Sequence, residues 1–122
     1  MADTYDFALT IWKNNQRLSG FDPIVRRITC DESQGFTYEK ATGGGYVAVP
    51  SNQLDTIQAL LLTADQALTV RLDGQTDAGI VLGAGGLLLI VNATIDAAAA
   101  TNVTIDNSSG STANVKGLAA GT

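Results

Sequence analysis

The chain is built from short segments in which apolar and more polar residues alternate, and turn-forming residues end each segment. In one such segment Tyr5, Phe7, Leu9 and Ile11 occupy every second position, and residues 68–72 repeat the pattern. A period of two residues is that of a β-strand with one buried face. The alternation therefore predicts an all-β fold rather than a helical one.

Eight to ten short strands are expected, because turn signals recur about every ten residues, as in a β-sandwich or jelly roll. Their approximate ranges are 5–12, 24–29, 35–40, 46–49, 57–63, 68–72, 80–82, 87–91, 103–106 and 113–117. The consecutive leucines Leu60, Leu61 and Leu62 indicate a strand buried on both faces. Only residues 51–58 and 97–100 offer plausible helical turns.

Charge is distributed unevenly between residues 1–40 and residues 41–122. The chain of 122 residues has a length that suits one domain. Residues 1–40 hold five basic and six acidic residues, whereas residues 41–122 hold two basic and six acidic ones, for a net charge of −5. We expect a single domain over 1–122, with N-terminal strands or an arm in 1–40 and a β-sandwich core in 41–122. Nucleic-acid binding is not expected, because no basic stripe is present to neutralise phosphates.

The residue types exclude most catalytic and metal chemistry. The chain has no histidine and one cysteine, so it lacks Ser-His-Asp and Cys-His nucleophile pairs and the usual zinc ligands. A carboxylate pair of the glycosidase type is conceivable, but few aromatic residues are available to line its cleft. Asp73, Gln75 and Asp77 alternate as in a calcium loop, yet the twelfth position holds Ala84 instead of glutamate. We therefore expect no enzyme activity, no cofactor and no metal.

Cys30 is expected to be a small apolar filler, since Asp31 and Glu32 beside it oppose thiolate formation. The longest apolar stretch, residues 83–91, is far below the roughly 20 residues of a membrane-spanning helix. Acidic residues at the N-terminus are unlike a secretory signal. The expectation is synthesis in a cytosol and no membrane partner.

Three segments carry a resemblance to a known class of protein. Residues 60–74 form a strand ending in Arg71-Leu72-Asp73-Gly74, residues 83–89 form a glycine-rich turn into an apolar strand, and residues 107–115 form an Asn-Ser-Ser-Gly hairpin. In this order they resemble small virion structural proteins of tailed bacteriophages. The resemblance extends from Leu54 to Gly121, a little over half of the chain.

The resemblance implies a β-sandwich or β-tulip-like module on the virion, made in the host cytoplasm. Its leading implication is a capsid decoration (cement) protein that binds the major capsid protein, often as a homotrimer, and stabilises the shell. A tail, head-fibre or baseplate component is the nearest alternative. A carbohydrate- or receptor-binding module is another, for which Trp12, Tyr38 and Tyr46 are the candidate aromatic residues.

The N-terminal segment from Ala2 to Arg27 is the predicted contact with a neighbouring subunit. It carries most of the basic charge, and aromatic and arginine side chains are enriched at protein interfaces. The candidate interface residues are Trp12, Arg17, Phe21, Arg26 and Arg27. Arg26 and Arg27 are adjacent in a predicted strand and should point to opposite faces, so one could meet an acid or a partner chain.

Overall fold

The computed structural model describes residues 3–18, 24–43, 45–50, 54–72, 78–96 and 103–122. Within these ranges all regular structure is β-strand, which confirms the all-β prediction. The strands are β1 (Asp3–Leu9), β2 (Trp12–Lys13), β3 (Gln16–Arg17), β4 (Ile24–Cys30), β5 (Glu32–Lys40), β6 (Val47–Ala48), β7 (Thr56–Ala64), β8 (Leu68–Arg71), β9 (Ile80–Leu82), β10 (Leu87–Asp96), β11 (Thr104–Asp106) and β12 (Ala113–Gly121).

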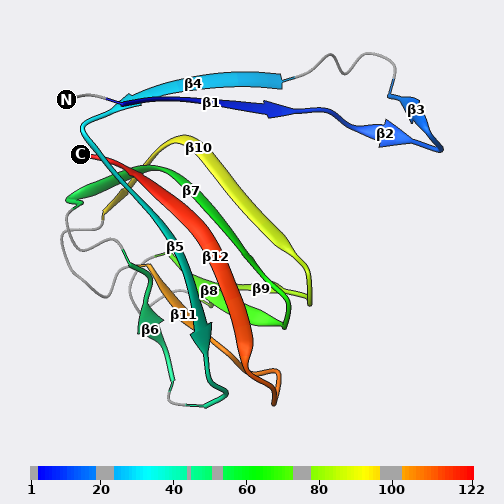
Figure 1. Cartoon of the computed structure of the whole chain (residues 1–122), viewed down its shortest axis with the longest axis vertical. Helices are drawn as coiled ribbons and strands as arrows, with labels where there is room; N and C mark the ends of the chain where they lie inside the picture. Colours follow the sequence, from blue (N-terminus) through cyan, green and yellow to red (C-terminus); the bar gives the residue numbers. More distant parts are fainter. Residues whose placement is uncertain (1–2, 19–23, 44, 51–53, 73–77, 97–102) are drawn as a thin grey trace.

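Two four-stranded antiparallel sheets pack against each other to form a β-sandwich (Figure 1). One sheet has the order β10-β7-β12-β5 and contains the longest strands. The other has the order β6-β11-β8-β9. The turn from β9 to β10 connects the two sheets on one side of the sandwich.

The main core lies between these sheets and follows the predicted alternation. Leu60, Leu62 and Val115 project from the long sheet, and Val70 and Ile105 meet them from the other sheet, all of them with no exposed surface. Removing a side chain of this size from water contributes about 2 kcal/mol. Burial of this layer therefore stabilises the packing of the two sheets.

Two of the predicted local structures differ from the observed ones. Leu61 is only partly buried, because β7 has one face in the core and the other on the outer surface of its sheet. The suggested helical turn at 51–58 is wrong where the structure describes it, since Thr56 already belongs to β7. The turn suggested at 97–100 lies outside the described residues.

Strand β10 is longer than the predicted range 87–91. It continues to Asp96 through an irregularity, where the register with β7 shifts between Val91 and Ile95 and Asn92 has a φ of 60°. Asparagine tolerates this left-handed conformation better than most residues, and such a bulge lets a strand continue beyond a break in its pairing.

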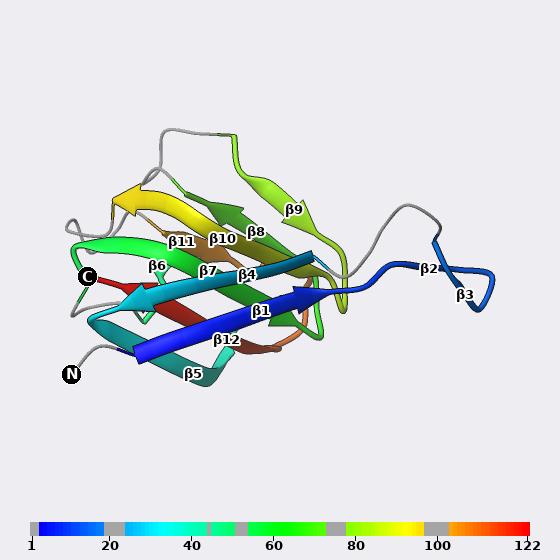
Figure 2. The ribbon, with the colours of Figure 1, turned by 90° about the horizontal axis from the view of Figure 1, so that it is seen from above.

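Strands β1 and β4 form a separate two-stranded ribbon that lies over the outer face of the long sheet (Figure 2). They pair in continuous antiparallel register from Asp3 opposite Cys30 to Leu9 opposite Ile24. After Cys30 the chain passes directly into β5, which pairs with β12 inside the long sheet. The N-terminal arm therefore ends at Cys30 rather than at residue 40.

Beyond the ribbon, β2 and β3 form a small hairpin, here called the tip (residues 11–18), which projects away from the sandwich (Figures 1 and 2). It is closed by a backbone hydrogen bond of 3.0 Å from Leu18 N to Ile11 O. Asn14 and Asn15 have φ values of 50° and 64°. Two consecutive positive φ values are typical of the type I′ turn of a tight hairpin.

Candidate interaction surface

The two faces of the ribbon have different chemistry, which follows from its register. Directly paired residues share a face, so Tyr5, Phe7, Ile28 and Cys30 all point toward the long sheet. There they pack with Ala59 and other small residues in a second apolar cluster. The Tyr5 hydroxyl also forms a 2.5 Å hydrogen bond with the Ser33 hydroxyl of β5. These contacts fix the base of the ribbon on the sandwich.

Cys30 lies in this second cluster and is 2% exposed. Burial raises the pKa of its thiol, and the negative charges of Asp3 and Asp31 raise it further. The cysteine is therefore a protonated packing residue, as expected, although desolvation outweighs the neighbouring acids as the cause.

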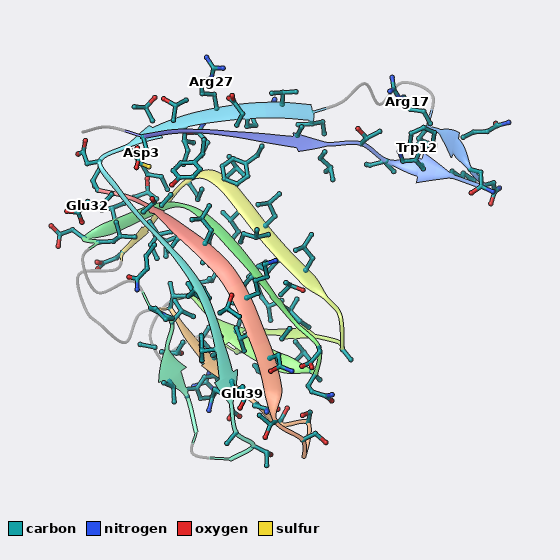
Figure 3. All side chains as sticks on the ribbon, in the orientation of Figure 1. Asp3, Trp12, Arg17, Arg27, Glu32 and Glu39 are labelled. Carbon is teal, nitrogen blue, oxygen red and sulfur yellow. The ribbon has the colours of Figure 1, made fainter. Side chains whose placement is uncertain are left out.

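The outer face of the ribbon carries an ion pair between Asp6 and Arg27, which face each other across the two strands. The Arg27 guanidinium donates to both carboxylate oxygens at 2.7 and 3.1 Å. This hydrogen bonding holds the pKa of Asp6 below its usual value and raises that of Arg27. Figure 3 shows Arg27 pointing away from the sandwich. Both side chains are exposed, so the pair organises the surface and contributes little stability.

The tip brings together two of the predicted interface residues. Trp12 and Arg17 are cross-strand neighbours, and the guanidinium lies 6.0 Å from the centre of the indole ring (Figure 3). Trp12 is nevertheless 60% exposed. A large aromatic ring beside a cation is a group of the kind that dominates binding energy at interfaces.

An apolar groove lies where the ribbon meets the long sheet. It has a volume of about 170 Å³. Its lining comes from β1, β4 and β10 and consists of Phe7, Ala8, Leu9, Ile24, Arg26, Leu89 and Val91. Arg26 is the charged member, and its guanidinium donates to the Val25 carbonyl at 2.9 Å.

The five predicted interface residues do not form one cluster. Trp12 and Arg17 share the tip, Arg26 borders the groove, and Arg27 lies on the opposite face of the ribbon in its pair with Asp6. The two arginines thus point to opposite faces, as expected for neighbours in a strand. Phe21 lies outside the described residues.

Sequence reasoning missed the exposed aliphatic side chains around the tip and groove. Nine of the ten exposed large hydrophobic residues among the described ones lie on the ribbon, on the tip or on the β9–β10 side. They are Leu9, Ile11, Trp12, Ile24, Val25, Ile80, Val81, Leu87 and Leu89. Alternation predicted which residues share a face, but only the packing shows that part of the apolar face stays uncovered.

The structure adds little support for a metal site or for a carbohydrate site. No group of three potential metal-ligating side chains occurs within the described ranges, and the loop with Asp73 and Asp77 falls outside them. Tyr38 packs on Phe36 at the core, and Tyr46 lies under Arg71, whose guanidinium is 4.0 Å from the ring centre. In the described part of the chain no helix is long and apolar enough to cross a membrane.

No family model matches the chain, and no curated protein or solved structure matches it either. The fold and the exposed apolar surface therefore carry the functional argument, together with the resemblance found in the sequence.

Proposed function

We propose that this chain is a non-enzymatic structural subunit of a tailed-bacteriophage virion, and that the ribbon and tip hold it to its neighbours. The observation that carries the proposal is the exposed apolar surface of these elements. Nine exposed large apolar residues lie on the ribbon, the tip and the β9–β10 side, and exposed apolar surface of this kind marks interaction sites. A small β-sandwich with such a projecting arm is well suited to bind neighbouring subunits.

Within the virion, capsid decoration is the leading position. The protein would bind the major capsid protein on the outer shell as a homotrimer and stabilise the shell by many repeated apolar and main-chain contacts. The support for this step is the likeness of residues 60–74, 83–89 and 107–115 to small virion proteins. A tail, head-fibre or baseplate component would use the same surface with fewer copies.

The carbohydrate- or receptor-binding alternative finds less support in the arrangement of aromatic residues. Sugar-binding sites commonly use exposed rings, but the three candidate rings have different surroundings. Trp12 is exposed at the tip, Tyr38 packs at the core and Tyr46 lies under Arg71. Trp12 is therefore the one largely exposed ring of the three.

The proposal is tested by co-sedimentation of the purified protein with expanded shells of its parent phage that were assembled without it. Saturable binding at many copies per shell supports decoration, and binding at a few copies supports a tail or fibre position. Absence of binding to any virion assembly would overturn the proposal.

Two matched variants identify the contact in the same assay. Trp12→Ala removes the exposed ring of the tip, and Val47→Ala removes exposed apolar surface from β6, which is 46% exposed at this residue and belongs to the other sheet. We expect the first to weaken binding at least tenfold and the second to leave it unchanged. Equal binding by both variants would contradict the role of the tip.

A further inference from the structure

The groove between the ribbon and β10 has two apolar walls. Leu9 and Ile24, paired at the far end of the ribbon, form one wall and are 47% and 39% exposed. Leu89 of β10 forms the other and is 37% exposed, while Leu87, two residues before it on the same face, is 60% exposed. The ribbon and the sheet diverge here (Figure 1), which accounts for the exposure of these aliphatic side chains.

The adjoining edge of the sandwich is only weakly protected. β10 is an edge strand of the long sheet, and residues 87–95 contain no charged residue and no proline. Natural edge strands are normally blunted by charges, prolines, bulges or short length, because an exposed apolar edge promotes association. The irregularity of β10 near Asn92 is such a bulge, but residues 87–91 before it form a regular apolar edge. The opposite edge, β5, carries Glu32, Glu39 and Lys40. The β10 side is therefore the side of this sheet that is built to be covered.

The tip of the same chain does not cover the groove. The ribbon leads β2 and β3 away from the sandwich, and both views show the tip beyond the end of the sheets (Figures 1 and 2). Trp12 is thus an exposed apolar side chain, and the groove is an exposed apolar depression at a separate place on the same molecule.

The charge of the tip favours a second copy as the occupant. Residues 7–18 contain Lys13 and Arg17 and no acidic residue, whereas residues 41–122 hold two basic against six acidic residues. The basic tip and the net acidic residues 41–122 of another copy therefore attract each other at long range, whereas the charged residue at the groove itself is Arg26. Arg26 at the groove can in addition stack on an incoming indole ring, as Arg17 does within the tip.

We infer that the tip of one copy inserts Trp12 into the groove of the next, between Leu9 and Ile24 on one side and Leu89 on the other. Each copy then supplies one tip and one groove, and contacts of this head-to-tail kind close into a ring when the rotation between neighbouring copies completes a full turn and extend into a filament when it does not. The inference depends on the subunit-contact part of the proposed function and not on the phage assignment. It identifies the partner of the tip as the same chain.

A mixing experiment tests the pairing of tip and groove. Trp12→Ala leaves the groove intact, Leu89→Arg leaves the tip intact, and Val47→Arg serves as the matched control on β6. Molar mass is measured by light scattering over a range of concentrations, after thermal melting has shown that each variant is folded. We expect the wild-type protein and Val47→Arg to form multimers and the other two variants to be monomers of 12.6 kDa.

The decisive sample is the equimolar mixture of Trp12→Ala and Leu89→Arg. The tip of the Leu89→Arg chain can enter the groove of the Trp12→Ala chain, so we expect a heterodimer although neither variant associates alone. A mixture that stays monomeric, or single variants that keep the wild-type mass, would overturn the inference.

A second measurement keeps the test valid even if Leu89→Arg does not fold. Arg17→Cys, which pairs with Trp12 and keeps its ring, is mixed with Leu87→Cys beside the groove under mild oxidation, and Arg17→Cys with Val47→Cys is the control, with the buried Cys30 common to all chains. We expect a disulfide-linked heterodimer in the first mixture only, and its absence would contradict the contact. A protein that forms this contact but binds no shell would refute the phage role while leaving the contact intact.

Discussion

At the scale of single residues, one cross-strand pair shows how closely the long sheet is packed. Gly117 of β12 lies opposite Phe36 of β5, and the aromatic ring rests on the glycine. A Cβ added at Gly117 would meet the Phe36 ring at 2.5 Å and would also collide with the Leu61 carbonyl oxygen. The glycine is therefore required by a close approach of the backbone to a neighbouring ring and strand.

We predict that Gly117→Ala destabilises the protein by about 1–3 kcal/mol, the usual cost of overpacking a well-filled core. Gly35→Ala is the matched control, because its Cβ would make only an ordinary contact of 3.9 Å with the Gly117 carbonyl. Urea unfolding of the two variants measures the difference. Equal urea midpoints for the two variants would show that the packing of the Phe36 ring does not require a glycine at position 117.

Tyr38 is a second residue with a specific consequence for stability. Its hydroxyl oxygen is buried without a hydrogen-bond partner among the described residues. Burial raises the pKa of this phenol from 10.0 to about 12. The folded protein therefore keeps Tyr38 neutral at a pH where the unfolded chain has already lost the proton.

We predict that Tyr38→Phe stabilises the protein by about 1 kcal/mol, since an unsatisfied buried hydroxyl is costly. Tyr5→Phe should instead destabilise it, because the hydrogen bond to Ser33 is lost. The sign of the pH effect follows from the raised pKa: the contribution of Tyr38 to stability is present below pH 10 and falls as the pH rises from 10 toward 12. Thermal melts of wild type and Tyr38→Phe at pH 8 and pH 11 measure this, and a loss of stability equal in both proteins would contradict it.

At the scale of elements, the sequence predicted the strands well and their packing only in part. Alternation located β1, β5, β8 and β12 because each has one face against a core. It failed for Leu61, since three consecutive leucines look alike in a strand buried on one face or two. It could not assign the ribbon to a separate layer, because residues 5–11 alternate in the same way as a strand inside the sandwich.

The candidate interface was predicted with the same limits. Residue type identified Trp12 and Arg17, which the tip brings together. Residue type did not predict which of Arg26 and Arg27 borders the groove, because adjacent arginines in a strand differ only in the face they occupy. The exposure of Leu87 and Leu89 was not predicted, because an apolar strand after a glycine-rich turn indicates burial. In the structure the ribbon diverges from the long sheet before it would cover these two residues.

For the tip itself we predict that replacing both Asn14 and Asn15 by alanine loosens the hairpin, because alanine disfavours positive φ. Hydrogen exchange of the Leu18 amide, which bonds to the Ile11 carbonyl, should become at least several-fold faster. The melting temperature should stay unchanged, since the tip projects away from the sandwich. Unaltered exchange at Leu18 would contradict a turn held by these two residues.

At the scale of the whole molecule, the chain is a closed β-sandwich joined to an arm with uncovered apolar surface. The two regions can be separated by design. Deleting residues 2–27 should abolish binding to a virion particle without unfolding residues 54–121, but it would also uncover the second cluster around Ala59 and Ala120. A shorter deletion avoids this, because Leu9 and Ile24 already pair across the ribbon.

Assembly through the tip is therefore tested by the molar mass of the wild-type protein beside a variant in which an Asn-Gly turn replaces residues 10–23. The turn closes the ribbon at its last pair and removes only the tip and its connection. We predict that light scattering gives three times the 12.6 kDa chain mass for the wild type and the single-chain mass for the variant, with equal melting temperatures. A wild-type protein that stays at 12.6 kDa at every concentration, or a tip-less variant that still assembles, would contradict the account.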